Sequence, residues 1–426
     1  MLTADSDVMA RMQDTKIEAL RLLPGAPALF DALADRPGVY LVGGAVRDLM
    51  LGFAQFDFDL AVEGSAEQVA DDLVSKLGGR AIIHERFQTA TFVGADGDLV
   101  IDIAETRTET YERPGALPTV TPASLSEDLR RRDFTVNAIA VALWRAELGQ
   151  LVEFDGASAD LAARILRVTH DKSFIDDPTR LLRLLRYGAR LGFTAEPHTE
   201  ALARAAIDQG AAATVSGARI ADELMDVLAE RSAIAALDSM CALGLDRALH
   251  PHFHADEYLA SRVTIGAAEG LSQDLLLLAV CCIEMSEGEL VAWLDHLGLE
   301  QHRRATVLDA VLRHGEVLEA VARAGAASQL DSALRRYRPE TIQLAASLPR
   351  ADPETAELAR HWLHARRDDH LRISGADLRS AGIPEGPSIG RALAAALALA
   401  IDEGVESRDE QLQRALTVAR SDAHRA

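Results

Sequence analysis

The chain of 426 residues has few cysteines, few lysines and no long apolar run. Three cysteines, Cys241, Cys281 and Cys282, are too few for a disulfide framework, so we expect them to be buried packing residues. The longest apolar runs, 275–283 and 392–401, are about half as long as a bilayer-spanning helix. No membrane span is therefore predicted.

An export signal is also missing from the first residues, which mix acids with single apolar side chains and have no basic start. The protein is therefore expected in the cytoplasm. Hydrophobic residues make up 48% and charged residues 26% of the chain, the profile of a folded globular protein. The length predicts about two to four domains.

The formal net charge of −22 argues against non-specific adhesion to nucleic acid. Nearly all positive charge is arginine, which binds phosphates and base edges bidentately, although codon bias also explains an arginine excess. Residues 164–190 hold seven basic side chains against three acids and are the predicted phosphate surface. The basic residues there are Arg164, Arg167, Lys172, Arg180, Arg183, Arg186 and Arg190.

Hydrophobic periodicity predicts a mixed α/β head followed by a long helical remainder. Helices are predicted at 15–34, 45–51 and 66–77, and strands at 39–42, 56–62, 81–84, 89–93 and 99–104. Residues 108–124 are rich in Pro, Thr and Gly and are predicted to form a mobile loop. From residue 161 onward the pattern is helical.

Two aspartates alternate with apolar residues in the second predicted strand, which places the carboxylates of Asp57 and Asp59 on the same face. Asp102, in a similar strand, could add a third oxygen. Mg²⁺ prefers such oxygen ligands, and phosphoryl-transfer enzymes use them. An isolated Asp-x-Asp is more often a solvated strand edge. The buried face of this strand and the preceding glycine turn favour a catalytic metal site.

The glycine turn, Gly43-Gly44, lies between the first strand and the helix that contains Arg47. Glycines allow the backbone to approach a phosphate closely, and amides at a helix start can bind phosphate oxygens. Such turns are common for steric reasons alone. The combination with Asp57 and Asp59 makes this turn a candidate nucleotide-binding element.

Three segments in order resemble motifs of class II tRNA nucleotidyltransferases and bacterial poly(A) polymerases. They are residues 41–48 with 57–59, residues 128–138 and residues 176–186, and the resemblance spans about residues 39–193. Weaker similarity lies at 216–224 and 373–390. The third motif begins Asp176-Asp177 where the family commonly has Glu-Asp. The second acid and Arg180 are intact.

This resemblance implies an α+β fold, in which a nucleotidyltransferase head with a small antiparallel sheet precedes an all-α neck, body and tail. The implied divisions are a helical extension at 1–35, the head at 36–160, the neck at 161–230, the body at 231–330 and the tail, which binds tRNA, at 331–426. The implied substrates are CTP, ATP and the 3′ end of tRNA, with Mg²⁺ as cofactor.

The family's functional residues can be placed on this sequence. Phosphates of the nucleotide would be bound by Gly43, Gly44, Arg47 and Arg132, and Mg²⁺ by Asp57 and Asp59. Asp133 and Asn137 would lie close to the ribose. Asp177 and Arg180 would read the base, with Arg183 and Arg186 supporting the nucleotide.

Hydrogen-bonding chemistry agrees with the prediction that Asp177 and Arg180 read the base. An aspartate accepts from the exocyclic amine of cytosine or adenine while an arginine donates to the ring acceptor beside it. Helical spacing also predicts that Asp177, Arg180 and Arg183 share one polar face, opposite Leu181 and Leu185. A solvated arginine face is the ordinary explanation of such spacing. The two preceding motifs favour base selection.

The added product is left open between CCA, adenosine alone and poly(A). Members of the family that stop after two cytidines have a shortened loop at 108–124, so the stretch retained here predicts addition of the terminal adenosine. A non-catalytic RNA-binding protein is the alternative of another class. Retention of Asp57 and Asp59 counts against it.

Overall fold

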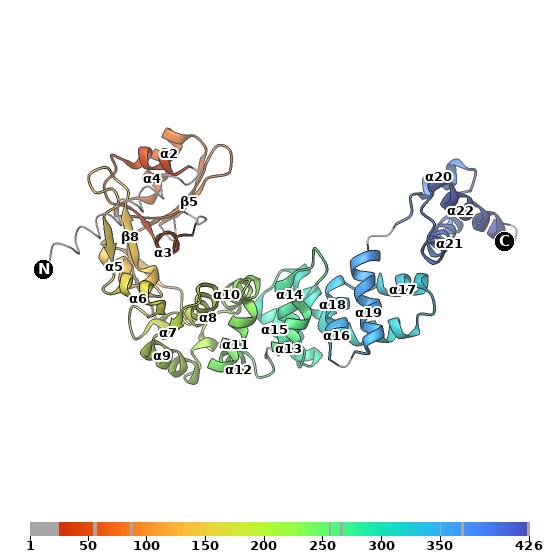
Figure 1. Cartoon of the computed structure of the whole chain (residues 1–426). Helices are drawn as coiled ribbons and strands as arrows, with labels where there is room; N and C mark the ends of the chain where they lie inside the picture. Colours follow the sequence, from red (N-terminus) through yellow and green to blue (C-terminus); the bar gives the residue numbers. More distant parts are fainter. Residues whose placement is uncertain are drawn as a thin grey trace. The chain divides into compact units, whose positions relative to one another are not determined.

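The computed structural model describes residues 25–53, 58–85, 88–254, 257–264, 267–349, 351–367 and 370–423. They form two compact units, one ending at Ala248 and the other beginning at Leu249 (Figure 1). Over these described stretches, no helix has both the length and the apolar character needed to span a bilayer. The implied five-part division of the chain stays a prediction.

A seven-stranded sheet forms the head of the first unit, in the order β3-β4-β5-β2-β1-β8-β9. The strands are β1 (Val39–Val42), β2 (Phe58–Val62), β3 (Arg80–His84), β4 (Thr89–Val93), β5 (Val100–Glu105), β8 (Ile139–Ala142) and β9 (Leu151–Glu153). Neighbours are antiparallel, as the resemblance implied, except that β2 and β5 are parallel. The connection from β2 to β5 contains a helix, which gives the crossover that a parallel pair needs.

Helices cover the sheet because its central strands are apolar on both faces. All four residues of β1 are buried. Helix α4 (Ala66–Leu77) packs on β3, β4 and β5 through the buried face that contains Val69 and Leu73. Helix α5 (Leu125–Arg130) shares a hydrophobic cluster with Tyr40 and Trp144. Helices α2 (Ala26–Leu33) and α3 (Gly44–Met50) complete the head.

The segment 108–124 differs from the predicted mobile loop, because most of it is a β-hairpin. Strand β6 (Arg107–Thr110) pairs antiparallel with β7 (Thr119–Pro122), and residues 111–118 form the tip. Both strands are rich in β-branched residues, which favour extended backbone. Pro and Gly, which suggested a loop, are concentrated in the tip. A capping box between Ser124 and Glu127 then starts α5.

The neck of the first unit is helical from α6 onward, apart from a short parallel pair of strands, β10 (Ile165–Leu166) and β11 (Thr194–Ala195). Its elements are α6 (Ala157–Ala163), α7 (Ser173–Asp176), α8 (Thr179–Leu191), α9 (Pro197–Asp208), η3 (Ala211–Thr214), α10 (Gly217–Ala229), α11 (Ala233–Leu243) and α12 (Leu245–Leu249). Helix α8 packs against both α10 and α11, and buries Leu181, Leu182, Leu184 and Leu185. The cavity described below opens between α8 and the head sheet.

The second unit is helical wherever it is described. Its helices are α13 (Glu257–Thr264), α14 (Gln273–Cys281), α15 (Glu287–Leu297), α16 (Gln301–Arg323), α17 (Ala327–Leu334), α18 (Pro339–Ser347), α19 (Pro353–His361) with a π-helical extension (Trp362–Arg366), α20 (Gly375–Ser380), α21 (Pro387–Glu403) and α22 (Arg408–Ala423). One hydrophobic cluster joins α16 to α19, and another joins α20 to α22.

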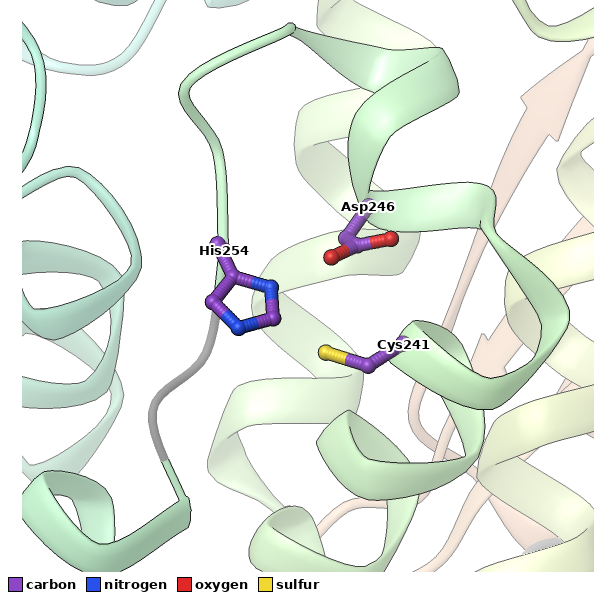
Figure 2. Close-up of side chains that lie close together, drawn as sticks. All are labelled: Cys241, Asp246 and His254. Atoms are coloured by element: carbon purple, nitrogen blue, oxygen red, sulfur yellow. The ribbon is translucent and has the colours of Figure 1, made fainter.

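None of the three cysteines forms a disulfide. Cys281 and Cys282 are buried, as expected, and burial raises the pKa of the Cys282 thiol. Cys241 is only partly buried, in contrast to the expectation. Figure 2 shows its side chain and that of Asp246 on the same side of the turn between α11 and α12.

Candidate active site

A cavity of about 500 Å³ lies in the first unit between the head sheet and the neck. It collects most of the side chains that the sequence singled out. The predicted residues that line it are Gly43, Gly44, Arg47, Asp59, Arg132, Asp133, Asn137, Asp177, Arg180, Arg183 and Arg186. Asp102 lines an adjoining cavity of about 410 Å³, which shares Asp59 and Arg132 with the first. Asp57 lies outside the described residues.

The carboxylates of Asp59 and Asp102 are neighbours on the sheet. Asp59 on β2 is in register with Asp102 on β5, and paired residues of parallel strands project to the same face. The Thr91 hydroxyl donates to Asp102 Oδ1 at 2.7 Å, which fixes that side chain. Asp59 is half-buried and Asp102 is exposed. Two adjacent carboxylates of this kind form a donor set suited to a hard divalent cation.

The glycine turn is required by the close approach of an arginine. Gly43 has a φ of 67°, and a Cβ there would lie 2.8 Å from Arg132 Nη1. Any other residue would carry backbone strain and push this guanidinium away. The sequence identified this turn from its glycines, but it gave no indication that Arg132 lies against it.

Arg47 lines the cavity, but its side chain is almost completely buried. The residue is 2% exposed, donates through Nε to Asp48 Oδ1 at 2.7 Å and through Nη1 to Asn137 Oδ1 at 2.7 Å. Its guanidinium also lies 5.0 Å from the centre of the Tyr187 ring. These contacts brace Asn137 and make Arg47 a support of the cavity floor.

Asp133 joins the second motif to the neck. Its Oδ1 accepts from Asn137 Nδ2 at 3.0 Å, and its Oδ2 accepts from Arg183 Nε at 2.9 Å. Burial alone would raise the pKa of Asp133, but the charge of Arg183 and the bond from Asn137 lower this pKa to about 2. The side chain therefore stays ionised inside the protein.

Asp128 is the first residue of the second motif, but the sequence predicted no role for it. It is 1% exposed, and its two oxygens each accept from one arginine, Arg131 Nη2 at 2.7 Å and Arg132 Nη2 at 3.0 Å. Burial opposes ionisation, yet the two guanidinium groups lower the pKa of Asp128. The spacing i,i+3 and i,i+4 was the signal that could have identified this clamp.

The predicted base-reading pair, Asp177 and Arg180, is held by hydrogen bonds from other parts of the first unit. Asp177 is the extended residue before α8, not part of the helical face that spacing predicted. Its Oδ1 accepts from Thr179 Oγ1 and from Arg219 Nη2, both at 2.7 Å, and from the Thr179 amide at 3.2 Å. Within the described part of the chain, no residue donates to Oδ2.

Arg180, the second member of the pair, is 5% exposed. Its Nη1 donates to Ser173 Oγ at 2.6 Å and its Nη2 to the Arg131 carbonyl at 2.7 Å. Both nitrogens are therefore positioned by the protein at the cavity wall.

The basic segment 164–190 is largely neutralised by acids, which differs from the predicted phosphate surface. Arg183 pairs with Glu223, Arg186 pairs with Asp226 and Glu230, and Arg190 lies 3.7 Å from Glu230. These three acids are on one face of α10 and at its end. Because α10 lies about 40 residues further along the chain, the count of charges within the segment could not include them.

Three of the other residues that line the cavity lie outside the three motifs. Glu109 on β6 pairs with Arg131 at 2.7 Å, and it accepts from the Tyr111 hydroxyl at 2.8 Å. Tyr187 and Glu223 are the others. Burial raises the pKa of Glu223, and its Oε2 has no hydrogen-bond partner within the described structure. Glu223 lies in the segment of weaker similarity at 216–224 and Glu109 in the segment 108–124, but neither segment indicated a role for these residues.

Comparisons with known proteins agree with this geometry. Residues 39–167 match the poly(A) polymerase head domain. The chain is 35% identical over 90% of its length to the A-adding tRNA nucleotidyltransferase of Geobacter sulfurreducens, of which it covers 45%. It is 31% identical over 92% of its length to the CC-adding tRNA nucleotidyltransferase of Deinococcus radiodurans, of which it covers 93%.

A solved structure extends the agreement to the whole fold. The CCA-adding enzyme of Thermotoga maritima, complexed with tRNA, aligns with a TM-score of 0.73 and 27% identity over 95% of this chain and 98% of that chain. The Geobacter sulfurreducens enzyme is longer, and the chain spans less than half of its length. The match to the A-adding enzyme of Halalkalibacterium halodurans covers 44% of this chain and 44% of that enzyme. The 31% identity to the Deinococcus enzyme extends over nearly the full length of both chains. Together with the shared fold, it shows that the chain belongs to the tRNA nucleotidyltransferase family of CCA-, CC- and A-adding enzymes.

Proposed function

We propose that this protein adds CMP and AMP from CTP and ATP to the 3′ end of tRNA without a nucleic-acid template. The observation that carries the proposal is the environment of Asp177. All hydrogen bonds given to its carboxylate by described residues reach Oδ1, so Oδ2 is an oriented acceptor at the cavity wall. An amine of cytosine or adenine satisfies this acceptor, whereas the carbonyl that uracil or guanine has in its place repels it.

The neighbouring donors fit a triphosphate and a ribose. Arg132 lies against the glycine turn at Gly43, where the backbone allows a phosphate to approach. The amide of Asn137 is held between Arg47 and Asp133 and supports the cavity where the resemblance places the sugar. Because these side chains are fixed by buried bonds, the nucleotide meets a preformed site.

Mg²⁺ is the proposed cofactor, held by Asp59 together with Asp57 and with Asp102 as a further oxygen. The fit rests on Asp59 and Asp102, whose carboxylates share one face of the sheet. A bound Mg²⁺ would stabilise the charge that develops on the phosphates. In the reaction, the 3′ hydroxyl of tRNA bonds to the α-phosphorus, its proton passes to solvent or a carboxylate, and pyrophosphate leaves. The residues on this chain orient the two reactants for that exchange.

The hairpin β6–β7 is the reason to include adenosine in the product. Its tip, 111–118, has eight residues. In this family, enzymes that stop after two cytidines have a shorter segment here. Addition of adenosine alone is the second candidate, favoured by the similarity to the Geobacter enzyme. A poly(A) polymerase is a third possibility of the same class. With tRNA as substrate, the cytoplasm is the proposed location.

The deciding experiment offers three tRNAs, which end before the first C, after the first C and after the second C, together with CTP and ATP. A CCA-adding enzyme completes all three, and an adenosine-adding enzyme extends only the last. Long adenosine tails on any of them would indicate a poly(A) polymerase. Asp59→Asn is the inactive control, because it loses a carboxylate ligand worth several kcal/mol in the transition state. Incorporation by this variant at the wild-type rate would contradict the assignment of the site.

A further inference from the structure

We propose that the Tyr187 hydroxyl donates a hydrogen bond to the 2′ oxygen of the incoming nucleotide and so favours ribonucleotides over deoxyribonucleotides. The inference rests on the proposed function. Tyr187 lies on α8, one position beyond the third motif, and it lines the main cavity. No role was predicted for it from the sequence.

The Tyr187 ring is held in place by three neighbouring side chains. The guanidinium carbons of Arg47 and Arg183 lie 5.0 Å and 5.4 Å from the centre of the ring. Phe134 meets the ring edge to face, with 6.0 Å between the ring centres and 88° between the planes. Because these contacts come from the protein, the hydroxyl is positioned before a nucleotide binds.

The Tyr187 hydroxyl keeps a proton that it can donate to a ligand. Its oxygen accepts from Arg183 Nη2 at 2.9 Å, and over the described stretches no hydrogen bond uses the hydroxyl proton. Burial and the charge of Asp133 raise the pKa of Tyr187, so the phenol stays protonated at neutral pH. Tyr187 therefore offers the cavity one fixed hydrogen-bond donor.

The sugar of a bound nucleotide must lie between the residues proposed for the base and those proposed for the phosphates. Arg180, at the start of α8, belongs to the base end, and Arg132, at the glycine turn, belongs to the phosphate end. Arg183 lies about one helical turn beyond Arg180. It donates through Nε at 2.9 Å to Asp133, the residue after Arg132. This ion pair marks the position of the sugar, and the Tyr187 hydroxyl is bonded to its arginine.

The 2′ hydroxyl is the sugar group that best matches this donor. Its carbon is bonded to the carbon that carries the base, so it lies on the base side of the sugar. Helix α8 supplies both Arg180, proposed to read the base, and Tyr187. The 2′ hydroxyl can accept a hydrogen bond, and it is the group that distinguishes ribonucleotides from deoxyribonucleotides. With a deoxyribonucleotide, the Tyr187 hydroxyl has no acceptor on the sugar, which disfavours that substrate.

Tyr187→Phe in the full-length protein isolates the hydroxyl, because it removes one oxygen and keeps the ring. Arg183 retains two of its partners in this variant. Its Nε donates to Asp133 at 2.9 Å and its Nη1 donates to Glu223 at 3.0 Å. The cation–π contacts of the ring are kept as well, so the variant is expected to fold with a Tm close to that of wild type.

Tyr337→Phe is the matched control. Tyr337 belongs to the second unit and also has an arginine over its ring, with Arg313 at 4.5 Å from the ring centre. It is not one of the described residues that line the cavity. The control therefore removes the same atom from a similar environment, and it should change neither the rate nor the choice of sugar.

The first measurement is kcat/KM for ATP, 2′-dATP and 3′-dATP, with tRNA that ends after the second C. In Tyr187→Phe, the value for ATP and for 3′-dATP is expected to fall roughly threefold to tenfold, the size of one neutral hydrogen bond. The value for 2′-dATP should stay close to that of wild type, because this nucleotide never received the bond. The ATP to 2′-dATP ratio therefore falls, and the ATP to 3′-dATP ratio does not change.

The second measurement is equilibrium binding of ATP and 2′-dATP without tRNA, by calorimetry, which needs no turnover. Tyr187→Phe should raise the Kd for ATP by a similar factor and leave the Kd for 2′-dATP unchanged. Equal losses with ATP and 2′-dATP overturn the proposal, because a residue that only braces Arg183 would cause them. A lower ATP to 3′-dATP ratio overturns it too, since the hydroxyl would then contact the 3′ oxygen. If wild type incorporates no ATP, the proposed function has failed, whereas incorporation with unchanged ratios in Tyr187→Phe defeats this inference alone.

Discussion

Asp133 is buried where the head meets the neck, and its charge is matched entirely from inside the protein. Arg183 supplies the opposite charge at 2.8 Å, and Asn137 supplies a hydrogen bond. Removing one partner of a buried ion pair leaves the other charge unmatched. The loss of stability is then larger than the net contribution of the pair relative to apolar residues in its place. Asp133 should therefore be a residue on which stability at neutral pH depends.

A pH titration of stability tests this residue. The pKa of Asp133 is lowered to about 2 in the folded protein and is about 4 in an unfolded chain. The folded state binds this proton more weakly, so the carboxylate stabilises the fold above about pH 4 and the contribution is lost as the pH falls towards 2. Asp133→Asn should lower the free energy of unfolding at neutral pH by about 2 kcal/mol.

Urea unfolding at several pH values measures the effect, and the wild type and Asp133→Asn should converge in acid. Asp96→Asn, at an exposed turn, is the control and should leave stability unchanged. A constant difference between wild type and Asp133→Asn from neutral to acid pH would mean that the charge of Asp133 is not the stabilising feature.

At the same scale, the sequence predicted which residues gather but not how they are held. Gly43, Asp59, Asp133 and Asp177 all line the cavity, as their motifs indicated. The partners that fix them come from distant segments, such as Arg219 for Asp177, which is 42 positions away in the sequence. Such contacts depend on the packing of α8 against α10, which no local pattern encodes.

Among the elements, strands and helices of the head were predicted well where apolar periodicity is strong. Helix α4 begins and ends at the predicted residues, and β1 and β4 do as well. Prediction was wrong for the hairpin β6–β7, because Pro and Gly in its tip dominated the composition of the whole segment. The parallel pairing of β2 with β5 could not be obtained from periodicity, since alternation is the same in both kinds of sheet.

The packing of α8 on α10 leads to a prediction about the ion pairs between these two helices. Arg186 pairs with Asp226 and Glu230, so its charge belongs to the interface between the two helices. Arg186→Gln should lower the free energy of unfolding by about 1–3 kcal/mol, because the partly buried Glu230 loses its counter-charge. Arg204→Gln is the control, since Arg204 forms an exposed pair with Glu200 within α9 worth under about 0.5 kcal/mol.

Thermal unfolding and tRNA affinity should be measured together on these variants. The expected result for Arg186→Gln is a lower Tm with tRNA affinity close to that of wild type. A wild-type Tm combined with weaker tRNA binding would instead support the original interpretation of residues 164–190 as a phosphate surface.

On the scale of the whole molecule, a net charge of −22 must be reconciled with the proposed RNA substrate. Long-range repulsion disfavours any nucleic acid, so binding requires local positive sites that release counterions. The affinity for tRNA should fall steeply with salt, with a log–log slope of roughly 0.7 to 0.9 for each phosphate neutralised. Fluorescence anisotropy with labelled tRNA over a series of KCl concentrations measures this slope.

Unrelated single-stranded RNA is the comparison for that titration. The acidic surface should keep its affinity low at every salt concentration, so that the two RNAs differ most at low salt. A flat response for tRNA would show that arginine contacts to phosphate do not carry the binding, and equal affinities would show that the net charge does not discriminate.

The pairing of β1 with β8 has a consequence for how the protein is made. Leu41 pairs with Val141, about 100 residues further along the chain, and the cavity is completed by Glu223 on α10. During synthesis, one edge of β1 stays unpaired until β8 has left the ribosome. The cavity stays incomplete until α10 has been made as well. At translation speeds of about 5–20 residues per second, the interval between the synthesis of β1 and that of β8 lasts on the order of ten seconds. Nascent chains therefore expose an apolar strand edge for that time, the stage at which chaperones would be needed most.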